Sequence, residues 1–143
     1  DSDARIQGLC DGAAAIGAAL LPYAAAAIRE AFEESGILLA RKTGQTALLS
    51  AAEASALAPF RPKLDKGEIG LAEFLIEHDL RLAGDQLVRF AHWITPAFMP
   101  KRFDTQFFAA VAPKGQLGTT AARRSIPSGS RRATRRAIRN AGP

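Results

Sequence analysis

The sequence predicts a single α/β domain, and three observations support this class. Residues 22–35 carry the pattern of a helix that ends at a glycine. Residues 37–41 form a short apolar run that fits a buried strand. Residues 87–94 and 103–111 have the composition of two strands joined by a proline-containing loop. Strands that alternate with helices along a chain are typical of the α/β class.

Two further helices are predicted between the first strand and the last two. Residues 47–58 indicate one helix, which we expect to end at Pro59 and the region of Pro62, because proline disfavours the continuation of a helix. Residues 71–78 indicate another, with apolar side chains on one face and charged side chains on the opposite face. There is no internal repeat.

The composition is that of a globular protein. Of the 143 residues, 48% are hydrophobic and 23% are charged, which is enough to build a core. The alanine-rich run 13–28 is interrupted by Gly17 and Pro22 and does not reach membrane-spanning length, so no membrane is expected as a partner. The single cysteine, Cys10, excludes an internal disulfide and a multi-cysteine zinc site. A reducing, cytoplasmic location fits this cysteine usage.

Three glutamates share one face of the first predicted helix. Glu30, Glu33 and Glu34 are spaced by three and four residues, so they project from neighbouring turns of the same side. Carboxylates this close repel one another, and Mg²⁺ or Mn²⁺ would relieve that repulsion because these cations prefer oxygen ligands. Arg29 is close enough to brace Glu33, and Gly36 suits the left-handed residue that ends a helix. The alternative is a solvated helix face with one ion pair.

Residues 29–37, which read Arg-Glu-Ala-Phe-Glu-Glu-Ser-Gly-Ile, resemble the helical half of the Nudix box. The pattern of that half is Arg-Glu, an aliphatic residue, any residue, Glu-Glu, any residue, Gly and an aliphatic residue. Every charged position and the glycine match, and Ala31 and Ile37 fill the aliphatic places. The resemblance implies a mixed sheet between helices. It also implies a hydrolase that splits a nucleoside diphosphate linked to another group, using a metal to activate water.

The resemblance implies a role for each charged residue of the segment. Glu33 and Glu34 are expected to be direct metal ligands. Glu30 is expected to be either a ligand or the base that takes a proton from the attacking water. Arg29 is expected to orient the glutamate side chains. The metal would be Mg²⁺ or Mn²⁺.

The first half of the usual box is absent at its normal distance, because its glycine and glutamate places fall on Ala15 and Leu21. The coenzyme A diphosphatase-like Nudix proteins and their bacterial relatives carry an insertion that splits the box, and residues 1–21 would lie in it. A second match supports this subgroup: residues 90–96 (Phe-Ala-His-Trp-Ile-Thr-Pro) and 100–108 (Pro-Lys-Arg-Phe-Asp-Thr-Gln-Phe-Phe) resemble its Trp-x-Thr-Pro and Arg-Phe-Asp-Thr-x-Phe-Phe signature.

Side chains of the second match have alternative roles. Asp104 is a candidate for a substrate or second-sphere group, and a structural role at a strand end is an equal alternative. No partner can be identified for His92 or for His78 from the sequence. The aromatic residues are expected to belong to the sheet and core rather than to stack on a substrate: Trp93, Phe103, Phe107 and Phe108.

We therefore expect residues 1–112 to be a partial Nudix domain that lacks the glycine-rich half-box and the coenzyme A-recognition motif. The expected substrate is a nucleoside diphosphate-linked small molecule such as coenzyme A or acyl-CoA. Weak or absent activity is expected for this chain, because positioning supplies much of the rate of phosphate hydrolysis.

Positive charge is concentrated at the C-terminus. Residues 114–143 hold eight of the 19 basic residues and no acidic one, so the other 113 residues carry 11 basic against 14 acidic side chains. We expect residues 113–143 to be a basic, disordered tail. We interpret it as the product of a frame shift near Gly118. The alternative function is a small basic protein whose tail binds nucleic acid or anionic surfaces without specificity.

Overall fold

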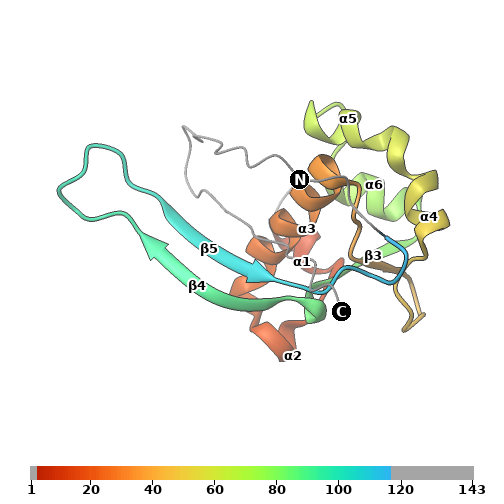
Figure 1. Ribbon diagram of the computed structural model, residues 1–143, viewed down its shortest axis with the longest axis horizontal. Coiled ribbons are helices and arrows are strands. Elements are labelled where there is room, and N and C mark those ends of the chain that lie inside the picture. Colours follow the sequence, from red (N-terminus) through yellow and green to blue (C-terminus); the bar gives the residue numbers. More distant parts are fainter. Residues whose placement is uncertain (1–2, 117–143) are drawn as a thin grey trace.

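A computed structural model describes residues 3–116 of the chain. The α-helices, strands and three short 3₁₀ helices (η) are arranged as in Figure 1, in the order α1 (Asp3–Gln7), β1 (Cys10–Asp11), α2 (Ala13–Ile16), η1 (Ala18–Leu20), α3 (Leu21–Ser35), β2 (Ala40–Lys42), α4 (Ala51–Ala56), η2 (Ala58–Phe60), α5 (Arg61–Asp65), α6 (Leu71–Glu77), β3 (Leu80–Ala83), η3 (Gly84–Gln86), β4 (Val88–Ile94) and β5 (Asp104–Ala109).

The body of the protein is built around a three-stranded sheet with the order β1-β3-β2. The central strand β3 pairs in parallel with β1, with Cys10 opposite Leu82. It pairs antiparallel with β2, with Ala40 opposite Leu82. The sheet is therefore mixed, and the predicted α/β class is confirmed. No helix within residues 3–116 is long and apolar enough to cross a membrane.

The long helix α3 supplies much of the core. Its small side chains allow neighbouring elements to pack closely against it, which accounts for the alanine-rich sequence. Phe32 of α3 stacks on Phe74 of α6 with ring centroids 5.9 Å apart. The buried residues of α3 are Leu21, Ala24, Ala25, Ala27, Ile28, Ala31 and Phe32.

The bounds of two predicted elements are corrected by local contacts. In the run 37–41 the apolar side chains are buried as expected, but pairing with β3 begins only at Ala40. The helix predicted at 47–58 begins at Ala51, because Ser50 forms a capping box with Glu53.

The two prolines expected to end that helix lie instead in the first turns of η2 and α5. A proline is tolerated there because its missing N–H would have no helical partner at that position. The helix predicted at 71–78 is confirmed as α6. His78 follows it and packs against the rings of Phe60 and Phe74, with centroids 4.5 Å and 5.1 Å away.

The strands β4 and β5 form a separate antiparallel hairpin that projects from the body (Figure 1). Both strands were predicted, but the expected burial of Trp93 is wrong, since 71% of this residue is exposed. Phe108 of β5 is buried in the core, whereas Phe103 and Phe107 are half-buried. β4 packs extensively on β5 alone among the described elements, so its apolar side chains have no second layer to enter.

Residues 113–116, which the predicted division assigns to the tail, pack onto the body. Gln116 is buried, accepts a hydrogen bond from the Leu38 amide at 2.9 Å, and donates to the carbonyls of Leu38 and Leu49 at 3.3 Å and 2.8 Å. The rest of the basic tail lies outside the described residues. The division at residues 112 and 113 stays a prediction.

Candidate active-site helix

The C-terminal turn of α3 is held from two sides. Gly36 adopts the predicted left-handed conformation (φ 77°), and its amide donates to the Phe32 carbonyl at 2.9 Å. Arg61 of α5 donates two hydrogen bonds to the Glu33 carbonyl, from Nε at 3.2 Å and from Nη2 at 2.9 Å. A Cβ atom at residue 36 would lie 3.3 Å from Arg61 Nη1. Gly36 and Arg61 therefore fix the turn that carries Glu33 and Glu34.

The predicted contact between Arg29 and Glu33 is present. Arg29 Nε lies 3.4 Å from Glu33 Oε1, and the two side chains are 44% and 10% exposed. Glu30 is half-buried and Glu34 is exposed. The glutamates of α3 thus differ in environment: Glu33 is braced and mostly removed from solvent, whereas Glu34 faces water.

The donor chemistry of α3 fits a hard divalent cation, because carboxylate oxygens are the ligands that Mg²⁺ and Mn²⁺ prefer. Between residues 3 and 116, however, no three His, Cys, Asp or Glu side chains are gathered into a group that could hold a metal ion. The glutamates Glu30, Glu33 and Glu34 lie on the predicted helix, but they do not form a closed ligand set. Their metal-binding and catalytic roles remain predictions.

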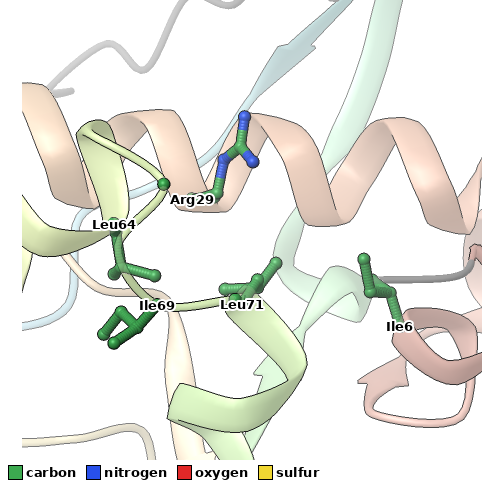
Figure 2. Close-up of a pocket in the computed structure, with 7 residues that line it drawn as sticks. Ile6, Arg29, Leu64, Ile69 and Leu71 are labelled. Atoms are coloured by element: carbon green, nitrogen blue, oxygen red, sulfur yellow. The ribbon is translucent and has the colours of Figure 1, made fainter.

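A cavity of about 270 Å³ lies beside Arg29 on α3 (Figure 2). In this view Ile6 and Leu71 point toward the helix, and Leu64 and Ile69 lie on the same side of it. The cavity is lined by Arg29 together with aliphatic side chains and two glycines. Its residues are Ile6, Arg29, Leu64, Gly67, Ile69, Gly70 and Leu71.

The second matched segment forms the turn end of the hairpin. His92 Nε2 lies 2.6 Å from Asp104 Oδ1, so His92 has a partner that sequence reasoning did not identify. Thr95 Oγ1 accepts from the Phe103 amide at 2.8 Å, and Arg102 Nε donates to the Thr95 carbonyl at 3.2 Å. These contacts join the two halves of the segment across the turn. They favour the structural alternative for Asp104.

A four-residue ion cluster, which has no local signature in the sequence, ties the body sheet together. Arg41 of β2 binds Asp85 with both nitrogens of its guanidinium end, at 2.7 Å and 3.0 Å, and Asp11 at 3.2 Å. Arg81 binds the other oxygen of Asp11 at 2.8 Å. The hydrogen bonds from Arg41 lower the pKa of Asp85 to about 2. Each carboxylate is paired with arginine, so the cluster joins β1, β2, β3 and η3.

The buried thiol of Cys10 lies next to this cluster and is not a candidate nucleophile. Burial raises the pKa of Cys10 to about 11, which keeps the group in its unreactive thiol form at neutral pH.

Comparison with solved structures finds a protein with a similar fold. The protein is similar to a crystal structure of a NUDIX hydrolase from Alicyclobacillus acidocaldarius, with a TM-score of 0.54 and 26% sequence identity. The similarity covers 78% of this chain and 50% of the other, so the matched region spans about half of the solved protein. No family model and no curated protein matches the chain. The architecture and the sequence of α3 therefore agree on one resemblance, to the Nudix hydrolases.

Proposed function

We propose that this chain carries the metal-binding helix of a Nudix-type pyrophosphohydrolase. The reaction would be the hydrolysis of a diphosphate linkage in a nucleoside diphosphate derivative. The observation that carries the proposal is α3 itself, where Arg29 braces Glu33 and the turn bearing Glu33 and Glu34 is fixed by Gly36 and Arg61. The similarity to a solved Nudix hydrolase supports it.

In the proposed reaction, water attacks one phosphorus atom and the bond from that phosphorus to the bridging oxygen breaks. Glu30 accepts the proton of the attacking water, or it joins Glu33 and Glu34 in holding the metal. A divalent cation on these carboxylates would neutralise charge on the diphosphate and lower the pKa of bound water. Arg29 keeps the Glu33 carboxylate in place. Arg61, which holds the Glu33 backbone carbonyl, would position this turn without contacting the substrate.

We further propose that the protein belongs to the coenzyme A diphosphatase-like subgroup, acts on coenzyme A or acyl-CoA, and works in the cytoplasm. The support for the subgroup and the substrate is the second segment, in which residues 90–96 and 100–108 match the subgroup signature. The proposed location rests on the single cysteine, which fits a reducing compartment. The contacts of His92 with Asp104 and of Thr95 with Phe103 give that segment a defined shape. The alternative of a nucleic-acid-binding tail rests on residues outside the described range.

Metal binding is the sharpest test, because it does not require a complete substrate site. Mn²⁺ affinity should be measured by electron paramagnetic resonance on the wild type and on the Glu33→Gln and Glu34→Gln variants. We expect each substitution to weaken binding at least tenfold, since metal ligation needs the charged carboxylate. Glu73→Gln, on the exposed face of α6, is the matched control and should bind as the wild type does.

Unchanged Mn²⁺ affinity in both α3 variants would remove these residues as ligands. Product chromatography with coenzyme A in Mg²⁺ or Mn²⁺ then tests the reaction. We expect slow turnover by the wild type, because the carboxylates are not closed into a ligand set among residues 3–116. We expect no turnover by Glu34→Gln, because that variant lacks a proposed metal ligand.

A further inference from the structure

A buried glutamine after β5 contacts the segment that follows the glutamates of α3. Gln116 accepts a hydrogen bond from the Leu38 amide at 2.9 Å and donates to the carbonyls of Leu38 and Leu49 at 3.3 Å and 2.8 Å. Within residues 3–116 the Leu38 amide has no other hydrogen-bond partner, because pairing of β2 with β3 begins only at Ala40. A single side chain therefore takes the place of the strand partner that Leu38 lacks.

The backbone that carries Gln116 is itself held in place. The amide of Gln116 donates to the carbonyl of Pro113 at 3.0 Å, which closes a turn, and Pro113 is buried. Gly115 in this turn has a φ of 82°, and a Cβ atom there would lie 3.4 Å from the Cβ of Ala51 in α4. We call residues 113–116 the strap. The strap is thus seated on the body before it reaches Leu38.

The connection between Leu38 and the glutamates is short. Only Ser35, Gly36 and Ile37 separate Glu34 from Leu38. Ser35 Oγ accepts a hydrogen bond from the Ile37 amide at 3.4 Å, Gly36 holds the left-handed conformation that ends α3, and Ile37 is buried. A displacement of Leu38 is therefore transmitted to the last turn of α3.

We propose that Gln116 is a positioning residue for the metal ligands Glu33 and Glu34. The inference rests on the proposed function, in which these carboxylates bind the cation. Arg61 holds the Glu33 carbonyl and Gln116 holds Leu38, so the turn that carries the ligands is fixed at both ends. Metal ligands need to be held within about 0.5 Å of their productive geometry. Loosening one end lowers metal affinity although every ligand is still present.

The first measurement is the Mn²⁺ affinity of the full chain, determined by electron paramagnetic resonance under conditions where urea unfolding shows each variant to be folded. Gln116→Met keeps the size of the side chain but cannot form these hydrogen bonds. We expect about tenfold weaker binding, the lower end of the loss seen when groups that orient metal ligands are removed.

Two controls separate positioning from a general loss of stability. Lys114→Ala changes an exposed residue of the strap and should bind Mn²⁺ as the wild type does. Leu80→Val changes the core at β3, which does not pack extensively on α3 among the described elements. It should lower stability and leave Mn²⁺ affinity unchanged.

The second measurement is amide hydrogen exchange of the metal-free protein, followed by nuclear magnetic resonance. We expect Gln116→Met to speed exchange at both Leu38 and Gly36 beyond any change in Leu80→Val, because local opening exposes these amides without global unfolding. Faster exchange at Leu38 with an unchanged rate at Gly36 would show that the loosening stops short of α3 and would overturn the proposal. So would wild-type Mn²⁺ affinity in Gln116→Met, or an equal loss of affinity in Leu80→Val.

Gln116→Asn carries the same test if Gln116→Met does not fold. Its amide is too short to reach Leu38 and Leu49 together, so we expect an intermediate loss of Mn²⁺ affinity, and wild-type affinity would count against the proposal. The two proposals fail in different ways. Mn²⁺ affinity that does not depend on Glu33 or Glu34 contradicts the proposed function, whereas affinity that depends on them but not on Gln116 contradicts this inference alone.

Discussion

The body and the hairpin follow comparable apolar patterns in the sequence, yet only the body buries its apolar side chains. Phe32 in α3 is 1% exposed, and Trp93 in β4 is 71% exposed. α3 packs against α1 and α5 and contacts β1 and β5, whereas β4 packs extensively on β5 alone among the described elements. A periodic pattern therefore predicts the type of an element, but burial depends on the layers that the rest of the fold places against it.

The largest expected contrast between the two regions comes from removing one phenylalanine from each. Phe74 is fully buried between Phe32 and Phe60, with ring centroids 5.9 Å and 5.6 Å away. Phe74→Ala should lower the free energy of unfolding by about 3–5 kcal/mol, because it leaves a cavity in the core. Phe90→Ala should lower it by less than about 1 kcal/mol, since 57% of Phe90 is already in water.

Urea unfolding followed by circular dichroism measures both changes. Equal losses for Phe74→Ala and Phe90→Ala would mean that the hairpin is packed as tightly as the body. That result would contradict the comparison.

Two glutamines that are each 5% exposed give a smaller contrast. Gln116 hydrogen-bonds three backbone groups of Leu38 and Leu49, and Gln116→Ala leaves those buried groups without their partner. We expect a loss of about 2–3 kcal/mol. Gln106 accepts one bond from Arg89, whose side chain can turn to water, so Gln106→Ala should cost about 1 kcal/mol or less. Thermal melting of both variants ranks them, and the reverse order would show that the hairpin contact matters more.

The features that the sequence predicted well are contacts between residues close together in the chain. The Arg29–Glu33 contact spans four residues, and the glycine that ends α3 acts within one turn. The short strands β1 and β3 were missed, because two and four residues are too few to show a period. Pairing of β3 with both β1 and β2 is what makes them strands.

Contacts between residues far apart in the chain could not be predicted from the sequence either. Arg61 reaches the Glu33 carbonyl from 28 residues away, and Gln116 reaches Leu38 from 78 residues away. Neither contact has a local signature in the sequence. Only the folded structure reveals that Arg61 and Gln116 hold the two ends of the segment 33–38. Similarly, His92 finds Asp104 only once the hairpin register is set.

The smallest expected contrast is between the Arg41–Asp85 pair of the body and the His92–Asp104 pair of the hairpin. It appears in the pH dependence of the free energy of unfolding. The hydrogen bonds from Arg41 lower the pKa of Asp85 from 3.8 to about 2 in the folded protein. Because the pKa is lower when the protein is folded, the ionised group stabilises the fold above about pH 4, and this contribution is lost as the pH falls toward 2. Since the Asp85 side chain is 32% exposed, solvent screening reduces the contribution to about 1–1.5 kcal/mol.

Urea unfolding of the wild type, Asp85→Asn and Asp104→Asn between pH 7 and pH 2 tests this difference. Asp85→Asn should lose about 1 kcal/mol at pH 7 and should show a flatter fall in stability below pH 4 than the wild type. Asp104→Asn should change stability at pH 7 by less than about 0.5 kcal/mol, because both side chains of the His92–Asp104 pair are substantially exposed, at 35% and 45%. If Asp85→Asn kept the acid dependence of the wild type, the Arg41 pair would not be what holds β2 to η3. Acid sensitivity that vanished in Asp104→Asn instead would place the pH-dependent contact in the hairpin.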